Sequence, residues 1–205
     1  LSDRFLCAAR CAAALVLAVG TASLLEYVFN WDLRIDQLLF AESPDAVFTS
    51  RLGLMAPNTA VSFILIGFSF WLACKRGEPG RNARRLFVWQ AGMVMTGLIA
   101  VLALLGYIFD VPAMQGVLNY TRMAFPTSSA FAILSLGGLC LAPRDGIAAI
   151  VSGEAAGNLV LRRLLLPAMG GPILLGWIVL NAIRTGVYDA SFGVTLLVGS
   201  IMLVL

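Results

Sequence analysis

The chain has 205 residues, of which 60% are hydrophobic and only 12% are charged, with a net charge of +3. Soluble domains are about 45–50% apolar and about 25% charged, so this composition argues against a soluble enzyme and against a disordered chain. The small positive charge without a basic face argues against a nucleic-acid binder. The absence of histidine excludes imidazole as a metal ligand or catalytic base. We therefore predict a polytopic membrane protein.

Six apolar runs approach the length of about 20 residues that a helix needs to cross a bilayer. We predict an all-α fold, a polytopic transmembrane bundle of about six helices that forms a single domain over residues 1–205. The predicted spans are 8–29, 57–74, 86–109, 124–142, 164–183 and 190–205. The first run has no polar cleavage region before Glu26, so we interpret it as a retained helix rather than a signal peptide. Because the sequence begins at Leu1 and stops at Leu205 inside an apolar run, we expect a protein truncated before a cytoplasmic module.

Basic residues are distributed unequally between the predicted loops. Cytoplasmic loops of membrane proteins are enriched in Lys and Arg. With a cytoplasmic N-terminus, ten of the 14 basic residues fall on the cytoplasmic side, most densely at 75–85. Most acidic residues fall on the outer side in the same arrangement, so we predict that the N-terminus is cytoplasmic. The spans carry almost no charge at mid-depth, which argues against an ion pump or a proton-coupled transporter.

Two predicted hairpins resemble each other. Residues 55–73 align with residues 123–142 at an offset of 68, and both stretches begin with Met-Ala. The sequence Tyr-Val-Phe-Asn at 27–30 aligns with Tyr-Ile-Phe-Asp at 107–110 at an offset of 80. We therefore predict a bundle built from repeated helical hairpins in the same orientation, with the last two spans as a third copy. Resemblance through apolar composition alone is the alternative.

The predicted starts of the second and fourth spans share a pattern of proline and small polar residues. Pro57 and Pro126 suit a first helical turn, where the N–H that proline lacks would have no partner. The neighbouring polar side chains can cap the free N–H groups of that turn, and they are Asn58, Thr59, Thr127 and Ser128. Two helix N-termini beside Arg51 and Arg122 can instead hold an anionic group. Plain capping is the alternative to ligand binding.

These features place a candidate ligand site at the outer mouth of the bundle. Its predicted residues are Arg51, Asn58, Thr59, Tyr107, Arg122, Thr127, Tyr188 and Asp189. Aromatic residues at this level are also typical of the belt that anchors helices at a membrane interface, which is the alternative interpretation. The sequence assigns no cofactor to the site.

The four cysteines all fall near the predicted cytoplasmic side, at Cys7, Cys11, Cys74 and Cys140. Their spacing is not a zinc-binding pattern, and buried cysteine commonly serves as a small apolar residue, so we predict no metal site. A nucleophile–base pair, a catalytic carboxylate pair and a phosphate-binding loop are all missing from the sequence. We therefore assign no catalytic residues to this segment.

Several stretches resemble a known family of bacterial membrane regions. They are MAPNTAVSFILIGFSFWLA, LLGYIFDVPA, TRMAFPTSSAFAILSLGGLCLAP, RRLLLPA and GVYDASFG. Together they resemble the N-terminal multi-pass membrane region of sensor histidine kinases and some diguanylate cyclases. The chain departs from that pattern at Leu54, where the family carries an arginine. No histidine-kinase box, ATP-binding motif or GGDEF motif is present in the sequence.

The resemblance implies a sensory input domain in the bacterial inner membrane that passes a stimulus to a cytoplasmic output module, so that the full-length protein would be a histidine kinase or a cyclase. It implies the lipid bilayer as a partner, and a homodimer or a larger membrane complex as the assembly. One alternative is a non-catalytic accessory or assembly subunit of a membrane complex. Another is a small transporter or lipid-handling protein. Nucleic acid is not an expected partner.

Overall fold

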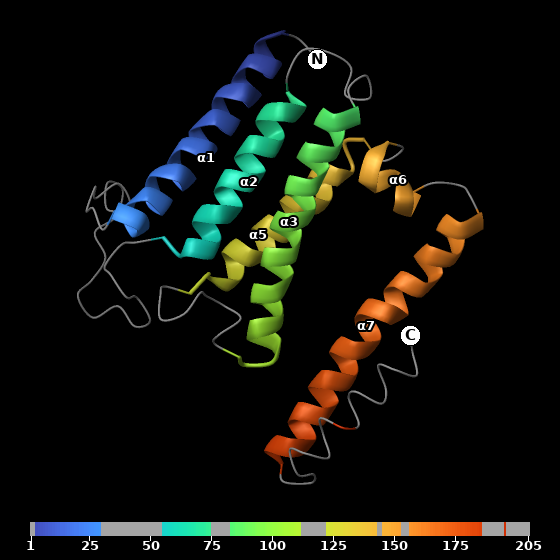
Figure 1. Cartoon of the computed structure of the whole chain (residues 1–205). Helices are drawn as coiled ribbons and strands as arrows, with labels where there is room; N and C mark the ends of the chain where they lie inside the picture. The colour runs from blue at the N-terminus through green and yellow to red at the C-terminus, as the bar shows by residue number, and fades with distance from the viewer. Residues whose placement is uncertain are drawn as a thin grey trace. The chain divides into compact units, whose positions relative to one another are not determined.

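A computed structural model describes residues 3–29, 55–74, 83–111, 122–142, 145–152, 156–185 and 195. All regular structure within these residues is helical (Figure 1). The helices are α1 (Asp3–Phe29), α2 (Pro57–Ala73), α3 (Ala83–Ile108), α5 (Phe125–Leu139), α6 (Gly146–Ser152) and α7 (Ala156–Arg184). The chain forms two compact units, Leu1–Ala149 and Ile150–Leu205. The all-α prediction is therefore confirmed for the described part of the chain.

Five predicted spans coincide with α1, α2, α3, α5 and α7, and the sixth, at 190–205, lies outside the described residues apart from Thr195. Two differences have the same cause. Helix α1 begins at Asp3 and α7 begins at Ala156, both earlier than the predicted spans. Their first turns contain charged or polar residues, which a search for apolar runs leaves out although they continue the helix. The short α6 was not predicted, because its seven residues show no helical periodicity.

Two of the helices are long and apolar enough to cross a membrane, over Arg4–Phe29 and Ala83–Ile108. Three shorter apolar helices accompany them, over Pro57–Ala73, Phe125–Leu139 and Gly170–Arg184. At 1.5 Å per residue, the 17 residues of α2 extend for about 26 Å, slightly less than the hydrocarbon core of about 30 Å. Length and hydropathy together therefore distinguish α1 and α3 from the other described helices.

The first unit contains two antiparallel hairpins that pack against each other. Helix α1 packs along α2, and α3 packs along α5, while α2 and α3 join the hairpins (Figure 1). At the centre of the unit, Phe63 of α2 meets Phe131 of α5 edge to face, with ring centroids 5.1 Å apart. Such aromatic pairs contribute about 0.5–1.5 kcal/mol beyond their buried area.

Small residues allow the paired helices to approach closely. A Cβ atom added at Gly67 of α2 would lie 2.8 Å from the backbone nitrogen of Leu17 in α1. In the second hairpin, a Cβ added at Gly97 of α3 would lie 2.8 Å from Oγ of Ser135 in α5. Leu17 and Gly97 are 80 positions apart, and Gly67 and Ser135 are 68 apart, which are the two sequence offsets noted above. One close glycine contact therefore falls at corresponding places in the two hairpins.

The interior of the first unit combines a few large apolar side chains, among them Trp89, Met93 and Phe131, with many small and hydroxyl-bearing residues, whereas many large apolar side chains lie on the exterior. Fully buried positions include Ser23, Ser62, Ser69, Thr96, Ser128, Ala60, Ala100 and Ala103. Other large apolar side chains point outward, and Val28 and Ile133 are each 70% exposed. Soluble bundles bury such side chains, whereas helices in lipid use small residues and hydroxyls at their contacts. The first unit therefore leaves extensive apolar surface uncovered.

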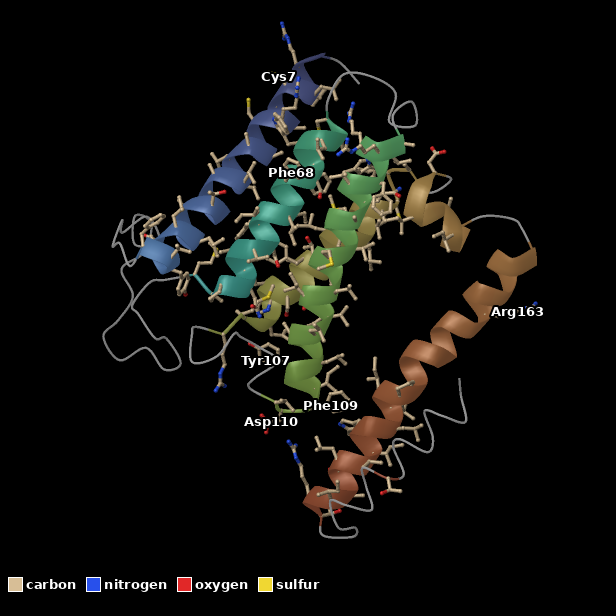
Figure 2. All side chains as sticks on the ribbon, in the orientation of Figure 1. Cys7, Phe68, Tyr107, Phe109, Asp110 and Arg163 are labelled. Carbon is tan, nitrogen blue, oxygen red and sulfur yellow. The ribbon has the colours of Figure 1, made fainter. Side chains whose placement is uncertain are left out.

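The hairpins have two chemically different ends. The tyrosine end contains the end of α1, the start of α2, the end of α3 and the start of α5, with Tyr27 and Tyr107. The arginine end contains the opposite ends of these helices, with Arg4, Arg10, Arg84 and Arg85. Figure 2 shows Cys7 at the arginine end, and Tyr107 with Asp110 at the tyrosine end.

Candidate functional site

The tyrosine end contains five of the eight predicted ligand-binding residues. Asn58 and Thr59 lie in the first turn of α2, Thr127 lies in the first turn of α5, Tyr107 ends α3, and Arg122 precedes α5. Thr59 is 7% exposed, while Asn58, Arg122 and Thr127 are half-buried. The other three predicted residues lie outside the described residues, namely Arg51, Tyr188 and Asp189.

Two tyrosine hydroxyls hold the chain in the same way at this end. The hydroxyl of Tyr27 donates to the backbone carbonyl of Met55, 2.7 Å away, just before α2 begins. The hydroxyl of Tyr107 donates to the backbone carbonyl of Met123, 2.8 Å away, just before α5 begins. Each tyrosine therefore ties the end of one helix to the start of the next. This structural use of the Tyr107 hydroxyl was not predicted from the sequence.

The predicted side-chain capping of α2 and α5 is wrong. Ala56 and Ala124 occupy the N-cap positions, and neither helix start has a side-chain cap hydrogen bond. A capping side chain must precede the helix, whereas Asn58, Thr59 and Thr127 lie inside its first turn. Ser128 lies further in, and its hydroxyl donates 2.8 Å back to the carbonyl of Phe125. The prolines do occupy the first turns, as predicted.

Asn58 and Thr127, two polar side chains at the tyrosine end, do not cap the helix N-termini. Asn58 and Thr127 form no hydrogen bond with any described residue. The N-termini of α2 and α5 carry partial positive charge at this end, and Arg122 adds a full one. The carboxylates of Glu26 and Asp110 lie at the same end, so the charges there are mixed, and the side chains of Asn58 and Thr127 are suited to hydrogen-bond a polar group.

Helix α3 reaches the neighbouring segments at the arginine end through two side chains. Arg85 donates from Nε to the carbonyl of Leu72, 2.8 Å away, and thereby satisfies the end of α2. Gln90 is fully buried, and its Nε2 donates to the carbonyls of Ala142 at 3.3 Å and Asp145 at 3.0 Å. These carbonyls lie in the segment between α5 and α6, so the Gln90 amide links α3 to that segment.

The other half of the Gln90 amide holds the start of α6. Its Oε1 accepts hydrogen bonds from the backbone N–H groups of Ile147, at 2.6 Å, and Ala148, at 3.4 Å. Gly146 precedes them with a φ of +61°, and a Cβ there would collide with Gln90 Oε1. The sequence did not predict this structural role of Gln90. Its polarity inside an apolar span was visible, but its partners are more than fifty positions away.

A cavity of about 500 Å³ opens at the arginine end between α1 and α2. Its lining residues are Leu6, Cys7, Arg10, Cys11 and Ala14 of α1 with Trp71 and Cys74 of α2, and we name it the thiol cavity. The three cysteines have free thiols. Nevertheless, no group of three possible ligands within the described residues is arranged to hold a metal ion.

A second cavity, of about 340 Å³, is apolar and lies between α1, α2 and α5. Its walls include Val16, Phe63, Ile66, Phe131 and Leu134. Cys74 lines both cavities. Two cavities therefore lie along the α1–α2 interface. The thiol cavity is lined by the charged Arg10, whereas the second cavity has no charged residue among the described residues of its wall.

Comparisons of this chain with family models, with curated proteins and with solved structures find no match. The assignment of function therefore rests on the residues and their geometry.

Proposed function

We propose that this chain is a sensory input region embedded in the bacterial inner membrane, which passes a stimulus to a cytoplasmic output module. The observation that carries the proposal is the large number of apolar side chains exposed along the helices, together with buried hydroxyls and alanines inside the bundle. Exposing that surface to water would be unfavourable by about 25 cal/mol for each Å² of apolar area. Lipid around the helices removes this cost.

The low burial of the two helices that are long and apolar enough to cross a membrane supports the same proposal. In their most apolar windows, only 11% of α1 and 28% of α3 is buried, whereas the core helix of a soluble protein is mostly buried. Helix α1 also packs closely on α2 through Gly20 and Gly67. A cleaved signal peptide needs no such contact, so the packing favours α1 as a retained helix.

Charge supports a cytoplasmic location for the arginine end. Four arginines of the described residues lie there, whereas Arg122 lies at the tyrosine end with Glu26 and Asp110. Labelling Cys140, which is exposed at the arginine end, with a membrane-impermeant maleimide tests this orientation. We expect reaction in inside-out vesicles only. Reaction in right-side-out vesicles would reverse the assigned faces.

The matching tyrosine bonds and matching close contacts support a duplicated hairpin as the unit of the bundle. In each copy, a tyrosine joins the two helices at the outer end. A group that binds near Asn58, Thr127 and the helix starts therefore acts beside the bonds that fix the helix positions. To produce a signal, it must bind one packing of the helices more tightly than another.

Gln90 provides the connection to the output side. Helix α3 runs from Tyr107 at the outer end to Gln90 at the inner end, where Gln90 holds the chain that leads into α6. A shift of α3 along α5 cannot preserve both sets of hydrogen bonds. The helix thus links the candidate stimulus site to the segment that continues toward α7.

A fusion of residues 1–205 to a diguanylate cyclase domain tests the proposal. Replacing Gln90 with Leu should change cyclase output at unchanged membrane abundance, and replacing Asn58 with Ala should change the response to the stimulus. Gly137→Ala is the matched control, since a Cβ at Gly137 meets nothing within 4 Å. Output that is the same for all variants would contradict the signalling role and favour the accessory-subunit alternative.

A further inference from the structure

We propose that the thiol cavity binds the headgroup of an anionic phospholipid, with Arg10 as the residue that contacts its phosphate. The inference rests on the membrane location proposed above. The cavity volume of about 500 Å³ lies in the range of about 300–1,000 Å³ that is typical of small-molecule sites. Arg10 is the only charged side chain in its wall.

The charge of Arg10 has no partner within the protein as described. Arg10 is half-buried as a residue and lines the cavity, and it forms neither a hydrogen bond nor an ion pair with any described residue. Arg85, at the same end, differs because it donates to the carbonyls of Leu72 and Ala73. A partly buried cation beside apolar walls is more stable with an anion bound, and phosphate fits the planar guanidinium in a bidentate manner.

The surface of α1 beyond the cavity distinguishes a lipid from a free anion. Ala14, Ala18, Thr21, Leu25 and Val28 are exposed and follow one another at the spacing of a single helix face. The Thr21 hydroxyl donates to the carbonyl of Leu17 at 2.7 Å, so it does not interrupt the apolar character of this face. From Ala14 to Leu25 the face extends for about 16 Å, roughly half of the hydrocarbon core and thus one leaflet. An acyl chain can lie along it below a headgroup held at Arg10.

The other residues of the cavity favour an anionic headgroup at this depth. Trp71 lies in the last turn of α2, a position typical of the interface between headgroups and hydrocarbon. Arg4 and Arg84 are exposed at the same end and raise the local positive potential. A zwitterionic headgroup brings its own cation into this field, whereas phosphatidylglycerol does not.

The native thiols report on occupancy of the cavity. Cys7 and Cys11 line it, while Cys140 is exposed at the same end without lining it. Each cysteine of the wild-type chain falls in its own tryptic peptide, whereas in Arg10→Gln the peptide 5–34 carries both Cys7 and Cys11, and fragmentation of that peptide assigns the alkylation to each thiol. The probes are vesicles of phosphatidylcholine alone and vesicles of phosphatidylcholine and phosphatidylglycerol in equal parts. Mass spectrometry then gives the rate at which N-ethylmaleimide, a neutral reagent, alkylates each cysteine. Cys140 corrects for the lower pH at an anionic surface.

For the wild-type chain, we expect phosphatidylglycerol to slow alkylation of Cys7 and Cys11 relative to Cys140 by about fivefold, the factor for one arginine at an anionic surface. Arg10→Gln should abolish this protection, whereas Arg10→Lys should retain most of it. Arg4→Gln is the matched control, because Arg4 is an exposed arginine on the same helix outside the cavity. It should leave the protection unchanged.

Flotation of the vesicles separates the possible failures. If the wild-type chain does not float with either vesicle, the proposed membrane location is wrong, and this inference fails with it. If the chain is inserted and the alkylation ratios are equal in the two vesicles, the lipid site alone is wrong. Equal protection by soluble glycerol phosphate in phosphatidylcholine vesicles would assign the cavity to a free anion and overturn the lipid assignment.

Discussion

Replacing Gly67 with Ala should separate α1 from α2. The new Cβ would lie 2.8 Å from the nitrogen of Leu17 and 3.0 Å from the carbonyl oxygen of Ala13, both of which are backbone atoms. Backbone cannot rotate away, so the helices must move apart by several tenths of an ångström. Overpacking of this kind costs about 1–3 kcal/mol. The higher helix propensity of alanine offsets about 1 kcal/mol, which leaves a net loss of up to about 2 kcal/mol.

Gly137→Ala is the control for this prediction, because its Cβ would enter open space on α5. It should stabilise the protein by up to about 1 kcal/mol through helix propensity alone. The free energy of unfolding is measured by titration of the micelle-bound protein with dodecyl sulfate and followed by circular dichroism. It should differ between the two variants by the overpacking cost alone, about 1–3 kcal/mol, because both gain the same helix propensity. Equal stabilities would refute the close packing of α1 on α2.

Three further substitutions test individual contacts. Gln90→Leu leaves the N–H of Ile147 and a buried carbonyl without partners, and we expect a loss of about 2–4 kcal/mol in the same titration, with faster hydrogen exchange in α6. Unchanged exchange there would exclude Gln90 as its anchor. Tyr27→Phe and Tyr107→Phe should each cost about 1 kcal/mol, and clearly unequal losses would argue against equivalent hairpins. Asp110 has a φ of +54°, so Asp110→Ala should be about 1 kcal/mol less stable than Asp110→Gly, and equal values would rule out that conformation.

The helices were predictable because long apolar runs and prolines are local signals. Pro57 and Pro126 lie in first turns as expected, and five runs became helices. The alignment of the two hairpins also marked the positions of Tyr27 and Tyr107. The sequence alone gives the offsets between the aligned residues. The hydrogen bonds of the two tyrosines depend on the three-dimensional path of the segment that follows each of them.

Tertiary contacts account for what the sequence did not indicate. Gln90 was recognisable only as a polar residue within an apolar run, because its partners lie beyond α5. The seven residues of α6 have no signal of their own, and their start depends on that same amide. One wall of the thiol cavity was predictable from the sequence, since the spacing of Cys7 and Cys11 places them on one face of α1. The contribution of α2 required the packing of the hairpin.

A spin label at Ile133 tests most directly whether the exposed apolar side chains face lipid. Ile133 is 70% exposed on α5, so its replacement by a labelled cysteine in a chain without other cysteines should not disturb packing. If this surface faces lipid, the label in proteoliposomes collides often with oxygen, which dissolves in lipid. It collides rarely with a water-soluble nickel chelate. Frequent collision with the nickel chelate would place this surface in water and contradict the proposal that the helices are embedded in a membrane.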